Sequence, residues 1–298
     1  GGSLPLSALK GLKGSIAVIT VCEGGFAWLF VLMLVTFVAP LVLPGTDLDF
    51  RAYLTMGIII GGISLATAPA VTMAIIGESK AHGPLTTTLL GVVALDDALA
   101  IVAYAIAIGI GVSIMSTSGD ISVLRLLTTE FGHIIFSVLL GAVSAFAMLW
   151  ITRYSRSRRE TLVLVLGIVV LSAELAANLD LFPLLANMTL GFVVVNRGKP
   201  SQDLVEVVHD IQDVIYVLFF TLAGAHLDLG IIRSAGVLAG LIVLGRCVGK
   251  FSGAWLGATV SGAPDVVRRY LGFALLPKAG VTVGLALLVV ETPELQEI

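Results

Sequence analysis

The sequence predicts an all-α protein that crosses a membrane many times. Hydrophobic residues make up 57% of its 298 residues and charged residues only 12%, whereas a soluble domain carries roughly 25% charged residues. The mean hydropathy is +1.06. Apolar runs recur along the chain at about the 20-residue length that a membrane helix needs. A chain this poor in charge lacks the polar residues to cover a water-facing surface, which excludes the soluble fold classes.

Nine apolar segments are predicted to span the membrane within one transmembrane domain over residues 1–298. The predicted spans are residues 15–43, 52–76, 85–112, 129–152, 161–179, 182–196, 211–226, 232–260 and 268–290. Segments 15–43 and 232–260 are long, so we expect them to tilt or protrude. Segments 182–196 and 211–226 are short, which favours tilted or partly interfacial helices.

The connecting loops alternate in charge, and this alternation supports the count of nine. Lysine and arginine favour cytoplasmic loops. The basic residues lie before the first span and after the second, fourth, sixth and eighth spans, whereas the intervening loops are poor in base. The pattern predicts a cytoplasmic N-terminus and a C-terminus on the opposite side. No nucleotide-binding glycine motif occurs, so nothing indicates ATP-driven pumping.

Two adjacent acids, Asp96 and Asp97, lie near the middle of the third span. A charged residue at this depth costs roughly 2.5–3.5 kcal/mol on insertion scales, and such residues are usually functional or paired. Successive helical residues point about 100° apart. One carboxylate can therefore face a cavity while its neighbour faces another helix. Two carboxylates held only by helix packing are the alternative.

Lys250 lies near the centre of the eighth span, and Arg246 is one turn away on the same face. A buried cation beside buried acids offsets the desolvation of both, so we expect Lys250 to pair with one of the aspartates. Arg246 either joins this group or extends to the membrane interface. Glu23 and Glu174 are weaker candidates that face a domain interface or a water-lined cavity.

Two spans contain helix-breaking residues. Pro69 interrupts the second span, and Pro277, Lys278 and Gly280 lie in apolar surroundings in the last one. A broken helix at mid-membrane depth offers free carbonyl groups to cations and free amides to anions, and interrupted segments in both halves of a chain are expected of inverted-repeat transporters. Lys278 is a candidate to offset the carbonyl ends of the half-helices. A simple proline kink is the alternative.

Several of these stretches resemble the cation/proton antiporter superfamily, in particular its NapA-type and Kef-type branch. The resemblance rests on Ala66-Thr-Ala-Pro-Ala, Glu78-Ser-Lys-Ala-His-Gly-Pro-Leu, Leu95-Asp-Asp-Ala-Leu-Ala, Phe182-Pro-Leu-Leu-Ala-Asn-Met-Thr-Leu-Gly-Phe, Leu218-Phe-Phe-Thr-Leu-Ala-Gly and Gly245-Arg-Cys-Val-Gly-Lys. It extends from about residue 15 to the end of the sequence. The aspartate pair with a downstream membrane lysine is its most specific feature.

The resemblance implies an NhaA-like inverted-repeat fold with two crossing broken helices, a core domain and a dimerisation domain, in a homodimer of the prokaryotic cell membrane. It implies that Asp97 binds the ion and that Asp96 pairs with Lys250. The crossing segments carry over as Ala66, Thr67, Ala68 and Pro69 in the first and Pro277, Lys278 and Gly280 in the second. The family usually has twelve or more spans, so we expect this chain to lack terminal helices.

The predicted activity is exchange of sodium, or another monovalent cation such as potassium or lithium, for protons by alternating access. Asp97 holds either a proton or a transported cation, not both. We expect no enzyme activity, no cofactor beyond the transported ions, no nucleic acid partner, and contact with membrane lipids. A sodium/organic-anion symporter of similar architecture and a non-transporting truncated membrane subunit are the alternatives.

Overall fold

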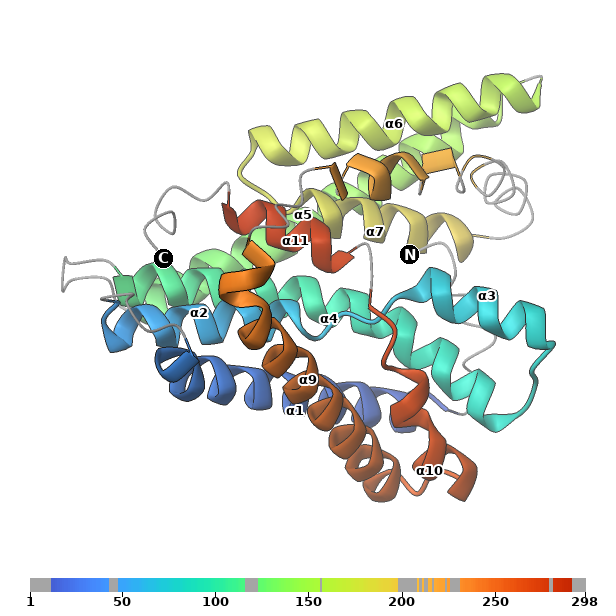
Figure 1. Ribbon diagram of the computed structural model, residues 1–298. Coiled ribbons are helices and arrows are strands. Elements are labelled where there is room, and N and C mark those ends of the chain that lie inside the picture. Colours follow the sequence, from blue (N-terminus) through green and yellow to red (C-terminus); the bar gives the residue numbers. More distant parts are fainter. Residues whose placement is uncertain are drawn as a thin grey trace. The chain divides into compact units, whose positions relative to one another are not determined.

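The described part of the chain is helical. The computed structural model describes residues 12–42, 48–115, 123–155, 157–197, 208, 211, 214–215, 217–222, 224–225, 231–278 and 281–290, and no strand occurs within these ranges. The helices are α1 (Lys13–Val42), α2 (Phe50–Ile63), α3 (Pro69–Ser79), α4 (Pro84–Met115), α5 (Val123–Thr152), α6 (Arg158–Asn178), α7 (Pro183–Val195), α9 (Ile231–Val260), α10 (Asp265–Ala274) and α11 (Val281–Val290) (Figure 1).

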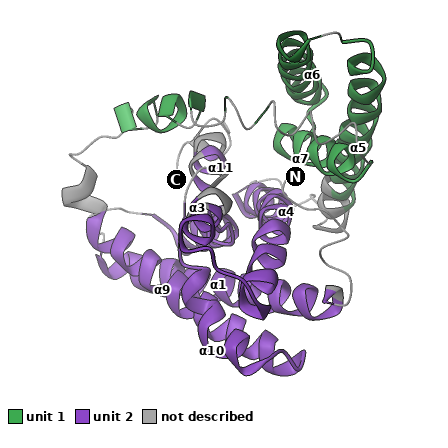
Figure 2. Cartoon of the chain, turned by 90° about the vertical axis from the view of Figure 1, so that its right-hand side faces the viewer, with its two compact units in different colours: residues 1–8, 128–227 green, residues 9–127, 228–298 purple. Residues whose placement is uncertain are grey.

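The helices form two compact units (Figure 2). Unit 1 comprises Gly1–Ala8 and Thr128–Leu227 and contains most of α5 together with α6 and α7. Unit 2 comprises Leu9–Leu127 and Asp228–Ile298 and contains α1 to α4 and α9 to α11. All the acids and bases that the sequence singles out as site candidates, apart from Glu174, belong to unit 2.

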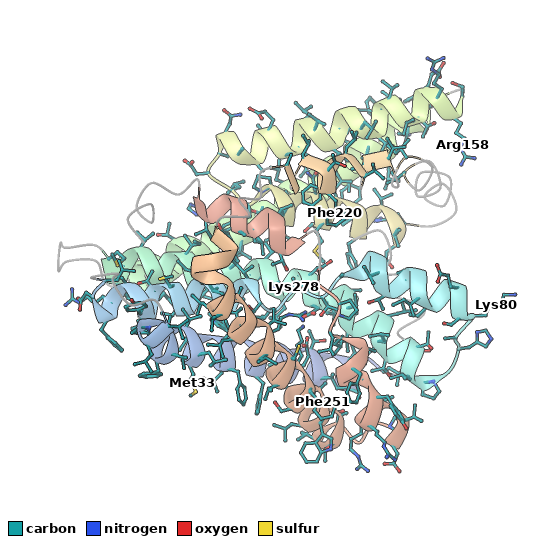
Figure 3. All side chains as sticks on the ribbon, viewed as in Figure 1. Met33, Lys80, Arg158, Phe220, Phe251 and Lys278 are labelled. Carbon is teal, nitrogen blue, oxygen red and sulfur yellow. The ribbon has the colours of Figure 1, made fainter. Side chains whose placement is uncertain are left out.

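The described helices have the length and surface of membrane spans. Five are long and apolar enough to cross a membrane, namely Gly14–Val42, Pro84–Met115, Phe131–Thr152, Arg158–Asn178 and Gly236–Val260. Only 17% of the most apolar stretch of α6 is buried. Large apolar side chains such as those of Met33 and Phe251 are exposed on unit 2 (Figure 3). Surfaces of this kind fit lipid rather than water, which confirms the prediction of a polytopic membrane protein.

Two of the predicted spans are broken, as their prolines indicate. The second, residues 52–76, consists of α2 and α3 with residues 64–68 outside any helix. The last, residues 268–290, contains most of α10 and all of α11. Pro69 stands at the start of α3, a position where its missing N–H costs no helical hydrogen bond. The predicted span 211–226 lies partly outside the described residues.

A row of glycines brings α9 against α1. The row consists of Gly245, Gly249, Gly253 and Gly257, which are four residues apart and so share one helix face. A Cβ atom on Gly249 would lie 2.6 Å from the Ala27 Cα, and one on Gly253 would lie 2.6 Å from the Glu23 Cα. Small residues let membrane helices approach to backbone contact. This approach sets the distance between Glu23 on α1 and the basic residues of α9.

Unit 1 is built on the packing of α5 with α6 and α7. A buried cluster joins Ala145 and Met148 of α5 to Val165 of α6 and to Leu190 and Val194 of α7. The start of α7 is fixed to α5 by a hydrogen bond of 2.9 Å that the Phe182 backbone N–H donates to the Ser137 hydroxyl. Gly141 of α5 lies against the Ala186 carbonyl of α7, so these two helices also meet at backbone distance.

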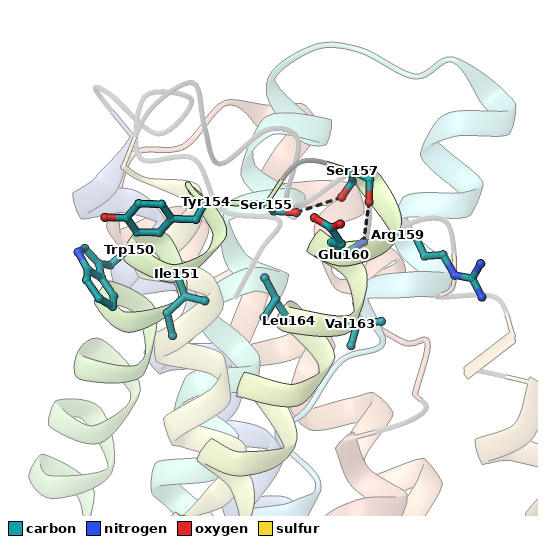
Figure 4. A pocket seen from close by; sticks show the side chains of 9 residues that line it. All are labelled: Trp150, Ile151, Tyr154, Ser155, Ser157, Arg159, Glu160, Val163 and Leu164. Atoms are coloured by element: carbon teal, nitrogen blue, oxygen red, sulfur yellow. Dashed lines mark hydrogen bonds between the residues drawn. The ribbon is translucent and has the colours of Figure 1, made fainter.

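A surface cavity of about 700 Å³ lies at the turn between α5 and α6 (Figure 4). Its lining is mainly apolar and aromatic, including Trp150 and Tyr154, with Arg159 and Glu160 as its charged members. The Ser157 hydroxyl caps α6 by accepting a hydrogen bond of 3.2 Å from the Glu160 N–H. None of the site residues predicted from the sequence lines this cavity.

Replacing Gly253 with valine should force α1 and α9 apart. The added atoms would meet the α1 backbone, and such overpacking typically costs about 1–3 kcal/mol. We expect a lower midpoint of thermal unfolding for the purified protein in detergent. Gly240→Val is the matched control, because nothing lies within 4 Å of a Cβ at that position of the same helix. Equal midpoints for the two variants would contradict the close packing.

Candidate ion-binding site

The two helix breaks of unit 2 lie side by side. α2 ends at Ile63 and α10 ends at Ala274. The backbone N–H of Ala68 donates a hydrogen bond of 3.0 Å to the carbonyl of Pro277. The two stretches of non-helical backbone are therefore joined to each other, far apart as they are in the sequence.

Arg246 of α9 binds the carbonyl ends of both half-helices. Its Nε donates to the Ser64 carbonyl at 3.0 Å, and one terminal nitrogen donates to the Ala66 carbonyl at 2.9 Å. The other terminal nitrogen donates to the Leu276 carbonyl at 2.8 Å. The helix C-terminus carries a partial negative charge, so one guanidinium offsets two such ends.

This arrangement decides two questions left by the sequence. The side chain of Arg246 is only 4% exposed, so it does not extend to the membrane interface. The role of offsetting the carbonyl ends, for which Lys278 is a sequence candidate, is filled by Arg246. The Lys278 side chain is exposed. A planar group with several donors suits this position better than an ammonium, because it reaches three carbonyls at fixed angles.

One turn along α9, Lys250 pairs with Asp96 of α4. Their side chains are fully buried, and the Lys250 Nζ lies 2.7 Å from Asp96 Oδ2. Thr67, in the first break, donates its hydroxyl hydrogen to the same carboxylate oxygen and accepts a hydrogen bond of 3.0 Å from Lys250. The pairing of Lys250 with an aspartate is the contact that the sequence predicts, and the break supplies the hydroxyl that joins it.

Glu23 of α1 is a second carboxylate on the same lysine. Its Oε2 lies 2.6 Å from the Lys250 Nζ, and both side chains are fully buried. The sequence places Glu23 only among the weaker candidates. Its position against the glycine row of α9 is the signal that distinguishes it, since small residues on one helix mark the face where another helix comes close. Glu174, the other weak candidate, is exposed and accepts a hydrogen bond from Asn178 within unit 1.

Asp97 lies in a different environment from Asp96. Its side chain is half-buried, and its buried Oδ1 accepts no hydrogen bond from the described residues. Within the same part of the chain, none of the ion pairs involves Asp97. The neighbouring carboxylates thus differ in their partners: Asp96 contacts a lysine and a hydroxyl through Oδ2, whereas Asp97 takes part in none of the ion pairs of the described residues.

The remaining predicted residues fall around the breaks. Ala66 and Ala68 use their backbone groups to bind Arg246 and the Pro277 carbonyl, respectively. Gly280 lies outside the described residues. The structure therefore brings Thr67, Asp96, Lys250 and the two breaks together, and adds Glu23 and Arg246 to them.

Comparison with known proteins identifies the family of this chain. The family described as "Sodium/hydrogen exchanger, transmembrane" matches residues 1–297. The chain belongs to the sodium/hydrogen exchanger family. Membership places it among membrane transporters rather than enzymes.

Three curated relatives of this chain carry antiporter names. A "High-affinity Na(+)/H(+) antiporter NhaS3" of Synechocystis is 21% identical over 74% of this chain and 48% of its own length. A "Na(+)/H(+) antiporter NhaP" of Pseudomonas aeruginosa is 26% identical over 76% of this chain and 52% of its own. An "Ammonium/H(+) antiporter subunit AmhT" of Alkalihalophilus pseudofirmus is 25% identical over 68% and 53%. The chain thus spans about half the length of the curated relatives it matches.

Replacing Arg246 with lysine should destabilise the crossing of the two breaks. A lysine ammonium cannot reproduce the hydrogen bonds that the guanidinium donates to three carbonyls. Each hydrogen bond from a charged group is worth about 1.5–3 kcal/mol. We expect a marked fall in the thermal midpoint in detergent.

Arg268→Gln is the control for this variant. Arg268 contacts Asp265 on α10 through an exposed ion pair, and such pairs contribute little. If the thermal midpoint of Arg246→Lys is no lower than that of Arg268→Gln, the hydrogen bonds of Arg246 do not hold the two breaks together.

Proposed function

We propose that this chain is the transport unit of a monovalent cation/proton antiporter in which Asp97 binds proton and cation in turn. The observation that carries the proposal is the contrast between two adjacent carboxylates. Asp96 has a lysine 2.7 Å away, whereas Asp97 takes part in no ion pair of the described residues and its buried Oδ1 accepts no hydrogen bond from them. A carboxylate in this condition can be neutralised by a proton or by a small cation.

Competition for one carboxylate is sufficient for exchange. A proton and a cation cannot both occupy Asp97, so arrival of one requires departure of the other. An ionised acid without a partner is costly in the membrane interior, so the site changes sides readily only when it is occupied. Empty crossings, which would dissipate the gradients, are then suppressed.

The architecture we propose for this activity is the NhaA-like fold. The paired breaks held by Arg246 correspond to its two crossing broken helices, as in inverted-repeat transporters whose ion sites lie at broken helices. Unit 2 then serves as the core domain and unit 1 as the dimerisation domain of a homodimer in the cell membrane. Movement of the ion-binding part would provide alternating access.

Sodium is the first cation to test, with potassium, lithium and ammonium as the others. The support is the naming of the relatives, two of which are Na⁺/H⁺ antiporters and one of which is a subunit of an ammonium/H⁺ antiporter. An organic-anion symporter fits less well, because an uncompensated carboxylate repels anions. A non-transporting subunit would have no use for a carboxylate without a partner.

Asp97→Asn should abolish cation-driven proton movement. The amide has the size of the acid but can neither release a proton nor supply a negative charge. The measurement is the change of a pH-sensitive dye inside proteoliposomes after addition of sodium, potassium, lithium or ammonium. We expect a signal for the parent protein with at least one of these cations and a loss of 100-fold or more for the variant, on the order of 3 kcal/mol.

Asp265→Asn is the control, since this aspartate is exposed on α10, and it should transport normally. Undiminished exchange by Asp97→Asn would refute the role of Asp97. A parent protein that responds only to organic anions, or to nothing, would favour the symporter or the non-transporting subunit.

A further inference from the structure

Lys250 faces two buried carboxylates rather than one. Its Nζ lies 2.6 Å from Glu23 Oε2 on α1 and 2.7 Å from Asp96 Oδ2 on α4. All three side chains are fully buried. Two oxygens this close to one nitrogen are also close to each other. Glu23, Asp96 and Lys250 therefore form one buried cluster of two acids and one base.

The charge of Arg246, one turn away on α9, is already balanced by other groups. Its guanidinium binds carbonyls at the ends of α2 and α10, and each helix C-terminus is equivalent to roughly half a negative charge. One positive charge therefore balances two helix ends. Lys250 is then the only full positive charge among the described residues that contacts Glu23 and Asp96.

A second ionised carboxylate in this place would be uncompensated, which is strongly unfavourable in a buried site. One of the two acids must therefore carry a proton. Asp96 accepts hydrogen bonds from both Thr67 and Lys250, and donors of this kind favour the ionised form. The Glu23 carboxylate accepts no hydrogen bond from a hydroxyl, amide or guanidinium group of the described residues. The proton accordingly resides on Glu23.

We infer that Glu23 is a second proton carrier of the transport cycle. The inference rests on the proposed antiport at Asp97. In the proton-loaded state, Asp97 and Glu23 are both protonated and Lys250 pairs with Asp96. When a cation binds between Asp97 and Asp96, Asp97 releases its proton and Asp96 leaves the lysine. Glu23 then releases its proton and becomes the counter-ion of Lys250.

The exchange of ions and protons balances without any change in the protonation of Lys250. One monovalent cation enters the site and two protons leave it, so one net charge crosses the membrane per cycle and exchange responds to the membrane potential. Lys250 stays protonated throughout, because a carboxylate is within contact distance before and after the switch.

Glu23→Gln tests this inference, because glutamine keeps the size of the side chain but cannot release a proton. The parent protein should release two protons per bound cation and should exchange faster or slower when a potential is imposed across proteoliposomes. Glu23→Gln should release one proton per cation, and its exchange should lose the response to potential. Glu174→Gln, at an exposed glutamate of α6, should behave as the parent protein does.

The two measurements also separate the possible failures. Two protons per cation from Glu23→Gln, or one from the parent protein, would overturn the inference. If Glu23→Gln binds cations but does not transport, the proton count in weakly buffered detergent solution still decides. Exchange that persists in Asp97→Asn would instead refute the proposed function, whatever Glu23→Gln does.

Discussion

Charge inside a hydrocarbon layer has to be balanced within a few ångströms, and this requirement governs unit 2. Lys250 is fully buried, and its nitrogen contacts Glu23, Asp96 and the Thr67 hydroxyl. Arg246 is nearly as buried as Lys250, and it contacts backbone carbonyls instead of acids. With these two bases accounted for, Asp97 takes part in no ion pair of the described residues, as the proposed exchange site requires.

The backbone supports this balance in two ways. The breaks after α2 and α10 expose carbonyl groups that a continuous helix would satisfy itself, and Arg246 takes up three of them. The glycine row of α9 lets α1 approach closely enough for Glu23 to reach Lys250. Packing and electrostatics therefore depend on the same helix, since α9 carries the glycines and both basic side chains.

Sequence alone predicts those features that depend on composition and on single residues. Apolar runs predict membrane spans, prolines predict the breaks, and charges in apolar runs mark Asp96, Asp97 and Lys250. Sequence does not predict which acid meets which base, because α1 and α4 are apolar on all sides and no polar face fixes their rotation. For that reason the sequence places Glu23 only among the weaker candidates. The choice between Arg246 and Lys278 likewise depends on how the breaks cross in space.

The Arg246 guanidinium donates hydrogen bonds to carbonyls at the ends of α2 and α10 at the same time. Neither end can therefore bend away without breaking charge-assisted hydrogen bonds. Hinge motion at a single break would also leave a buried guanidinium short of acceptors. The half-helices and α9 should therefore travel as one rigid body. In the proposed antiporter, access to Asp97 would then alternate through displacement of that whole body, with no local gate at the breaks themselves.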